Sequence, residues 1–192
     1  MQKIFKGLFR KYFQRIRIFI YSFLSDSSIT VSGLPIIKQP IVFKGKGKLI
    51  FRENVQLGYN PSPSFYSEVA YIEARNSEDT IIFGTDVFIN NTVTIISENG
   101  TISIGDNTLI GDHVRIINSD FHSLNPNERT TGIPLSANIS IGNNVFIGSN
   151  VTITKGVSIG ENSVIGICSV VTKNIPNNCI AVGTPAKIIR NL

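Results

Sequence analysis

The sequence has few cysteines, no acidic residue in its first 25 positions and no long apolar run, and each shortage argues against a class of protein. Two cysteines, Cys168 and Cys179, are too few for a disulfide framework and favour a reduced, intracellular protein. The longest apolar run near the N-terminus, residues 18–24, is far too short to span a bilayer. No small-residue cleavage site follows it, so we expect this segment to stay on the protein. No glycine-rich Walker loop is present, which argues against the phosphate grip of a nucleotide hydrolase.

The formal net charge of +5 is concentrated at the N-terminus. Six of the 18 basic side chains and none of the 13 acidic ones lie in residues 1–25, so the rest of the chain is close to neutral. A nucleic-acid-binding protein is disfavoured, because the basic charge is confined to one segment and no recognition motif appears.

Residues 1–24 have the pattern of an amphipathic helix. Apolar residues recur at helical spacing: Phe5, Leu8, Phe9, Tyr12, Phe13, Ile16, Ile20 and Phe23. The opposite face is basic: Lys6, Arg10, Lys11, Arg15 and Arg17. Two interpretations remain open. The helix lies on an anionic membrane surface, or it covers the solenoid described below or a neighbouring subunit. Residues 25–41 hold turn formers and two prolines, so residues 1–40 are expected to form a helix and a connector.

The dominant pattern of the chain is a six-residue repeat. From Ile141 to Val171 a large aliphatic residue returns at every sixth position: Ile141, Ile147, Ile153, Ile159, Ile165 and Val171. This period is neither helical nor a plain strand alternation, and it predicts short strands joined by tight corners. The corner pairs, such as Asn143-Asn144 and Glu161-Asn162, are rich in residues that tolerate left-handed backbone.

Three sides per coil would stack positions 18 apart at a spacing of about 4.8 Å. Ile159 would then lie over Ile141, and Val171 over Ile153. The same period appears earlier in the chain, with an irregular stretch at 60–80 and a slip at 98–100. Its earlier members are Phe51, Leu57, Phe83, Ile89, Ile95, Ile104, Ile110 and Ile116.

The hexads and the segments VTKNIP and AVGTPAKIIR after them resemble the hexapeptide-repeat acyltransferases over roughly residues 50–190. The resemblance implies an all-β solenoid, a left-handed parallel β-helix that usually assembles as a homotrimer. It implies an acyltransferase domain over residues 41–192, with a protruding loop at 123–139 and a closing segment at 175–192. Handedness and trimer follow from the resemblance alone, because the six-residue period defines neither.

The next repeat position after Ile116 is occupied by His122. The period then vanishes and returns only at Ile141, so the chain leaves the solenoid there for a long loop. In acetyltransferases of this family the root of such a loop carries the catalytic histidine, and His122 in NSDFHSLNPNERT matches that position. The resemblance therefore implies that His122 is the general base of direct acetyl transfer from acetyl-CoA to a hydroxyl.

Two carboxylates are candidates for orienting His122. If the backbone is extended, Asp120 lies on the same side as His122, and Glu128 in the loop is the second candidate. The other histidine, His113, is interpreted as an exposed corner residue. Two histidines cannot supply the three that zinc-dependent carbonic anhydrases of this fold use in each site, so we expect no metal.

The resemblance also implies residues that bind the two substrates. For the acceptor these are Asn90, the adjacent Asn91 and Arg129, although both asparagines also suit solenoid corners. For coenzyme A they are Gly148, Ser149 and Gly166 along the pantetheine, and Thr172, Lys173, Lys187 and Arg190 towards the adenosine end and its phosphates. Cations suit phosphates electrostatically, and the alternative is a solvated, charged tail.

The chain departs from the family pattern at two positions. The usual His-Pro pair is His122-Ser123, and a common Trp after the loop is Phe146. The DFH form resembles acetyltransferases of capsule, lipopolysaccharide or other surface polysaccharides. We therefore expect an acetyl-CoA-dependent O-acetyltransferase for a sugar hydroxyl, in the cytoplasm or at the inner face of the membrane. The alternatives are an acyltransferase for serine or an amino sugar, and a non-catalytic solenoid scaffold.

Overall fold

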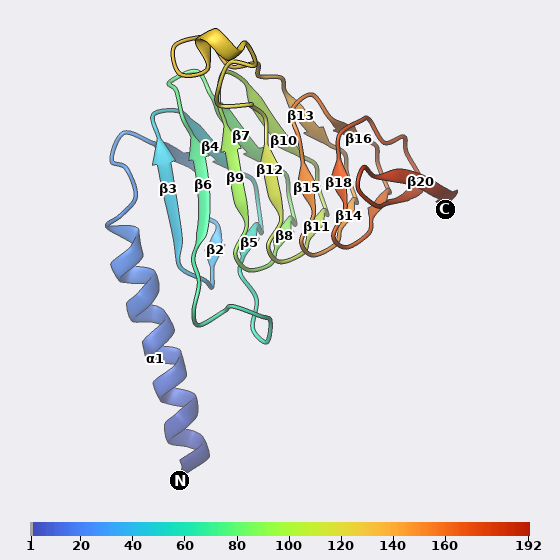
Figure 1. The fold of residues 1–192 in the computed structure, drawn as a ribbon. Coiled ribbons are helices and arrows are strands. Elements are labelled where there is room, and N and C mark those ends of the chain that lie inside the picture. The colour runs from blue at the N-terminus through green and yellow to red at the C-terminus, as the bar shows by residue number, and fades with distance from the viewer. Residues whose placement is uncertain (1) are drawn as a thin grey trace.

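The computed structural model of the chain describes residues 2–192 and consists of one N-terminal helix and a parallel β-solenoid (Figure 1). The helix is α1 (Gln2–Ser22). Sheet A contains β1 (Thr30–Ser32), β4 (Lys48–Phe51), β7 (Thr80–Phe83), β10 (Thr101–Ile104), β13 (Ile139–Ile141) and β16 (Ser158–Ile159). Sheet B contains β2 (Ile36–Ile37), β5 (Gln56–Leu57), β8 (Phe88–Ile89), β11 (Leu109–Ile110), β14 (Phe146–Ile147), β17 (Val164–Ile165), β19 (Cys179–Val182) and β20 (Lys187–Asn191). Sheet C contains β3 (Ile41–Gly45), β6 (Ala70–Ala74), β9 (Thr94–Ser97), β12 (Arg115–Ile117), β15 (Thr152–Ile153) and β18 (Val170–Val171).

The chain visits sheets A, B and C in turn, and each circuit is one coil. In Figure 1 the chain rises along the strands of sheet C, crosses behind and returns, while the coils advance from β3 towards β20. This sense of rotation is left-handed, so the predicted left-handed parallel β-helix is confirmed. We call the turn from sheet B to sheet C the B–C corner, and the turn from sheet C to sheet A the C–A corner.

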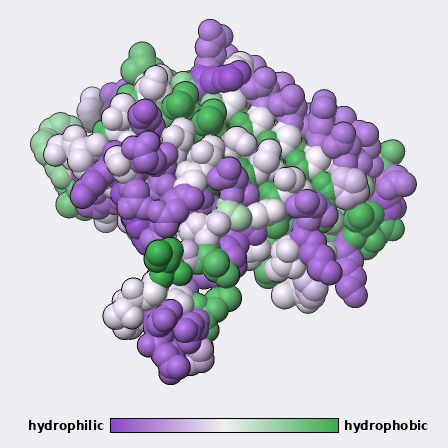
Figure 2. All heavy atoms as spheres, turned by 90° about the horizontal axis from the view of Figure 1, so that it is seen from above, coloured by the Kyte–Doolittle hydropathy of each residue, from purple (hydrophilic) through white to green (hydrophobic). Residues whose placement is uncertain are grey.

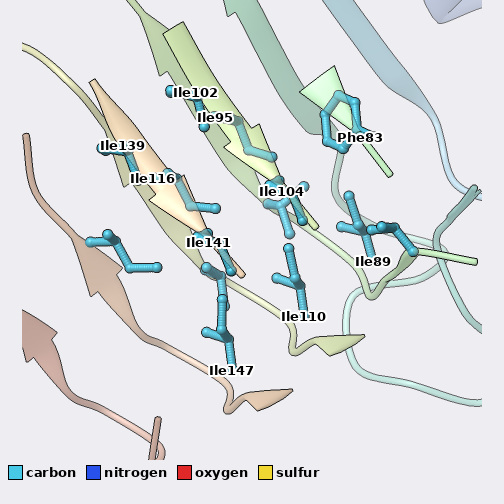
Figure 3. Packing of buried hydrophobic residues seen from close by; sticks show 14 of the residues in the cluster. Phe83, Ile89, Ile95, Ile102, Ile104, Ile110, Ile116, Ile139, Ile141 and Ile147 are labelled. Carbon is cyan, nitrogen blue, oxygen red and sulfur yellow. The ribbon is translucent and has the colours of Figure 1, made fainter. Parts of the chain in front are cut away.

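The predicted ladders are present. Ile141 pairs with Ile159, Ile147 with Ile165, and Ile153 with Val171. All six side chains are buried inside the prism, and Figure 3 shows the same inward packing for the preceding coils. The corners also behave as the residue types indicate, because left-handed backbone occurs at Asn144 (φ 53°), Asn150 (φ 58°), Gly156 (φ 75°) and Asn162 (φ 61°).

The solenoid starts earlier than the sequence indicates. The segment expected to be a connector contains β1, which pairs in parallel with β4, and β2, which pairs with β5. The first coil therefore begins at Thr30, not at Ile41. Its apolar residues Val31, Leu34 and Ile36 are exposed, so this coil lacks the fully buried side chains of the later coils.

The long loop leaves the prism at the C–A corner, after β12, and returns at β13. Its neck is closed by an antiparallel bridge between Ser119 and Ser136 and by the Ala137 N–H, which donates to the Asn118 carbonyl. One 3₁₀ turn, η1 (Pro126–Glu128), lies within it. From above, the face of the molecule that carries this loop mixes hydrophilic and hydrophobic residues (Figure 2). The excursion thus spans residues 118–138. It begins earlier than the predicted loop 123–139 and ends at nearly the same residue.

The closing segment turns back on itself. Ile175 forms a parallel bridge to Ile159, and β19 extends sheet B in parallel. The final strand, β20, pairs antiparallel with β19 and ends the sheet.

Candidate active site

His122 lies exposed at the root of the loop, where the backbone makes a sharp turn. Phe121, the residue before it, has φ 60°, and the Phe121 N–H donates to the Ser119 hydroxyl over 3.0 Å. This turn lifts the imidazole out of the repeat position and away from the core. His122 therefore stands beside the solenoid and does not take the inward place that the six-residue period assigns to it.

The hydrogen bonding of His122 defines its tautomer. Its Nδ1 lies 3.1 Å from the carbonyl oxygen of Arg129, seven residues further along the loop. A carbonyl oxygen can only accept a hydrogen bond, so Nδ1 must carry the proton in the neutral ring. Nε2 is then the atom with the lone pair, and this is the arrangement that a general base needs.

The expectation that Asp120 orients His122 is not met. It required an extended backbone between them, and the left-handed Phe121 breaks that geometry. Asp120 instead forms an ion pair with Lys155, with Oδ1 lying 2.6 Å from Nζ. Its second oxygen, Oδ2, is buried and has no hydrogen-bond partner. Neither predicted carboxylate bonds to the ring. The loop backbone at Arg129 orients it, and Asp120 fastens the loop root to the next coil.

Loss of Lys155 should therefore loosen the loop root. Lys155→Ala leaves the Asp120 carboxylate without its cation, at a cost of about 1–3 kcal/mol in unfolding free energy. Asp120→Ala and the double variant complete a mutant cycle, measured by urea unfolding and by proteolysis of the loop. We expect the double variant to lose less than the sum of the two single losses. Additive losses would mean that the ion pair does not hold the loop.

A charged network that sequence reasoning missed lies beneath the loop root. The guanidinium carbon of Arg75 lies 4.6 Å from the centroid of the Phe121 ring. The guanidinium nitrogens form ion pairs with carboxylate oxygens of Glu73, at 2.7 Å, and of Glu98, at 3.2 Å. Glu98 in turn accepts a hydrogen bond from the Ser119 hydroxyl. The hydrogen bond to Glu73 holds the pKa of Arg75 above its already high value.

Burial and the neighbouring Glu73 carboxylate raise the pKa of Tyr71 to about 12. The hydroxyl of Tyr71 donates to Glu73, so it belongs to the same network. Tyr71 and Glu73 on β6 and Arg75 directly after it alternate along the chain and therefore lie on the same side. That alternation was a readable signal within the irregular stretch 60–80, but their partners come from other coils.

The two asparagines predicted to touch the acceptor have different places. Asn91 is fully buried, and its amide binds the backbone of a second excursion between β5 and β6. The Asn91 Oδ1 accepts from the Tyr59 N–H at 2.9 Å, and Nδ2 donates to the carbonyls of Tyr59 and Pro63. The assignment of Asn91 to acceptor binding is therefore wrong, because its amide is used up inside the protein. Asn90 remains partly exposed at the B–C corner.

Asn91→Ala should destabilise the excursion at 58–69. The substitution removes three hydrogen bonds to the backbone of Tyr59 and Pro63, and an unfolding free energy lower by about 1–3 kcal/mol is expected. Urea unfolding and the rate of proteolytic cleavage within 58–69 measure the effect, with Asn90→Ala as the neighbouring control. A raised KM for acceptor at unchanged stability would contradict the structural role.

His113 is confirmed as a corner residue, with φ 56° at the B–C corner, but it is only partly exposed. Both ring nitrogens face carboxylates: Nδ1 lies 2.9 Å from Asp112, and Nε2 lies 3.3 Å from Glu68. Burial acts to raise the pKa of Asp112, but hydrogen bonds from Ser149 and His113 outweigh it and hold that pKa below its usual value. We therefore interpret His113 as a structural residue that connects Asp112 with Glu68.

The residues predicted to hold coenzyme A fall into three groups. Gly148, Ser149 and Gly166 stack at the B–C corner, where the Gly148 N–H donates to the Ile165 carbonyl. Thr172 and Lys173 follow β18 at the C–A corner, the corner that also carries the loop root. Lys187 and Arg190 lie exposed on β20. The glycines have a packing reason, because a Cβ on Gly148 would lie 2.8 Å from the Ile167 nitrogen.

The three coiled sheets and their hexads define a hexapeptide-repeat solenoid, and comparisons with known proteins agree. Residues 138–173 match the family model described as bacterial transferase hexapeptide (six repeats). The chain is 44% identical over 112 residues to the galactoside O-acetyltransferase of Escherichia coli (strain K12). The aligned region covers 58% of this chain and 54% of that protein. The chain thus spans about half the length of the curated relatives it matches.

Two solved structures have the same fold over most of the chain. The polySia-specific acetyltransferase NeuO superposes with a TM-score of 0.65 at 27% identity, over 88% of this chain and 72% of that one. A galactoside acetyltransferase in complex with coenzyme A superposes with a TM-score of 0.56 at 32% identity, over 85% of this chain and 65% of that one. The predicted resemblance to the hexapeptide-repeat acyltransferases is confirmed.

Proposed function

We propose that the protein is an acetyl-CoA-dependent O-acetyltransferase that acts on a sugar hydroxyl of a surface polysaccharide or its precursor. The observation that carries this proposal is the tautomer of His122, whose Nδ1 is held by the Arg129 carbonyl and whose Nε2 is left as the base. The sugar acetyltransferases among its relatives and structural neighbours support the substrate class.

The reaction requires one base and moves one proton. Bound acetyl-CoA supplies an activated acetyl group. His122 Nε2 takes the proton of the sugar hydroxyl as its oxygen attacks the acetyl carbonyl, and the new C–O bond forms as the C–S bond breaks. The imidazolium then returns the proton to the departing thiolate, so His122 is regenerated and no acyl-enzyme forms. Backbone N–H groups near the loop root would stabilise the oxyanion.

We further propose that the site is completed in a homotrimer. Asn90 precedes β9 at the B–C corner, whereas His122 follows β12 at the C–A corner. These positions lie at opposite ends of the strands of sheet C, so a single sugar unit would not meet both within one chain. The loop also exposes Leu124, Ile133 and Leu135, which a neighbouring copy would cover.

Coenzyme A then fits along the groove between copies. Its pantetheine would follow the stacked backbone at Gly148, Ser149 and Gly166, while Thr172, Lys173, Lys187 and Arg190 supply exposed polar and cationic groups for the adenosine end. No group of side chains suited to a metal ion occurs among residues 2–192. We place the reaction in the cytoplasm, in accord with two cysteines that are not joined.

The test is thiol release from acetyl-CoA with a panel of acceptors. The panel includes galactosides, sialic acid polymers, other surface polysaccharides, an amino sugar and serine, with an acceptor-free control. Turnover with a glycan hydroxyl, and acetyl ester in the product, are the expected result. Preference for serine or for the amino nitrogen would replace the proposed acceptor. A protein that neither turns over nor binds coenzyme A would be a scaffold.

A further inference from the structure

Helix α1 is attached to the solenoid by its polar face. Gln14 is buried, and its Nε2 donates to the carbonyls of Lys38 and Phe65 at 3.0 and 2.9 Å. Arg17, one turn further on, donates to the carbonyls of Phe65 and Glu68. These hydrogen bonds fix the rotation of the helix about its axis. The polar side therefore faces the body.

The opposite side of α1 is apolar and uncovered. The exposed aromatic residues on this side, which we call the outward stripe, are Phe5, Phe9, Tyr12, Phe13 and Phe19 of α1 and Phe23 in the turn after it. Figure 1 shows α1 extending away from the coils. The interpretation in which this face covers the protein's own solenoid is therefore wrong. So large an apolar patch on a soluble surface marks an interaction site.

Cations border the stripe. By the 3.6-residue period, Lys6 falls on one border and Arg15 on the other. Between α1 and the body lies a hollow of about 470 Å³, with Arg10, Lys11, Arg15 and Lys38 in its lining and no carboxylate among its described residues. The arrangement is an apolar face flanked by positive charge, which suits the boundary between acyl chains and anionic headgroups.

A second copy of the chain fits this surface less well. The stripe is broad and rich in phenylalanine, whereas paired helices use a narrow seam of branched aliphatic residues. Residues 1–25 also contain six cations and no acid, so a second α1 would bring like charge without a partner. Of the helices in residues 2–192, none combines the length and hydropathy of a membrane span. A helix lying in the plane of a lipid surface is consistent with all of these facts.

We propose that α1 docks the protein on an anionic phospholipid bilayer, with the outward stripe at the acyl boundary and the bordering cations at the headgroup phosphates. The solenoid would then stand on the surface with its glycan site beside the membrane. This places the protein at the inner face of the membrane, as one of the two sequence interpretations requires.

The test is flotation of the full chain with vesicles of phosphatidylcholine alone or with about one third phosphatidylglycerol. We expect binding to the anionic vesicles only. Lys6→Gln and Arg15→Gln together should weaken it by about 25-fold, at about five-fold for each bordering cation. Phe9→Ser with Phe19→Ser should also release the protein. Leu34→Ser, at an equally apolar residue that is 93% exposed outside α1, is the matched control and should bind normally.

Tryptophan gives a second readout. The chain contains none, so Phe9→Trp introduces a single fluorophore in the stripe, and Leu34→Trp a single one elsewhere. A blue shift on adding anionic vesicles is expected for Phe9→Trp alone. Binding that is lost with the cations but indifferent to Phe9 and Phe19 would overturn the inserted helix. So would a blue shift that appears without vesicles and depends on protein concentration, because it would identify a second copy as the partner.

Discussion

Under the proposed mechanism, His122→Ala is expected to lower the turnover of acetyl-CoA with a glycan acceptor by on the order of 10²–10⁴, because the acceptor hydroxyl would lose the base that takes its proton. The side chain is exposed and its ring is hydrogen-bonded to the loop backbone at Arg129, so the fold should survive the change. The measurement is thiol release at saturating substrates, together with coenzyme A binding, which should stay within a few-fold of the wild type.

The chain supplies its own control for this result. His113→Ala removes the other histidine, whose ring nitrogens both face carboxylates at the B–C corner. We expect that variant to keep its kcat and to lose only stability. If His122→Ala retained wild-type turnover, or if His113→Ala alone abolished it in a folded protein, His122 would not be the base.

Phe83→Ala is expected to produce the largest loss of stability, about 3–5 kcal/mol. Phe83 is fully buried in sheet A and stacks face to face on Phe51, with ring centroids 4.6 Å apart. Its removal leaves a cavity that the ladder cannot close, since the coils on both sides are fixed by register. At about 2–4 °C per kcal/mol for a chain of this size, Tm should fall by roughly 6–20 °C.

Phe146→Ala is the matched control for Phe83→Ala. Phe146 is the same residue type in another strand of the same solenoid, but its side chain is 49% exposed. Its loss should cost far less. Both variants should be unfolded at one protein concentration, because the stability of an oligomer depends on it. Equal losses for the two variants would mean that burial in the ladder does not decide stability.

The hexads allowed the fold to be predicted because each one contains a large aliphatic residue that must be buried. Ile141 and the aliphatic residues that follow it at every sixth position form a pattern within neighbouring residues, and such a pattern is visible in the sequence. The first coil escaped prediction because Gly33 and Pro35 give residues 30–37 the pattern of a connector, whereas the segment takes its place from pairing with β4 and β5. Pairing between distant segments leaves no trace in either one.

The site was predicted less completely than the fold. The root position of His122 followed from the break in the period, and its contact with Arg129 depends on how the loop folds back. The roles of Asp120 and Asn91 depended on neighbours 35 and 32 residues away, Lys155 and Tyr59. Backbone geometry at one residue, Phe121, was enough to turn Asp120 away from the histidine.

The closed neck of the loop separates the folding of the solenoid from the contacts that the loop makes. Ser119 and Ser136 form a bridge across this neck. The chain therefore leaves the solenoid after β12 and returns to it before β13 at neighbouring points, whatever the length of the loop between them. Insertions or deletions at residues 123–135 would alter what the loop reaches without shifting the register of any strand. Such a chain could change what its loop contacts while every strand of the solenoid keeps its register.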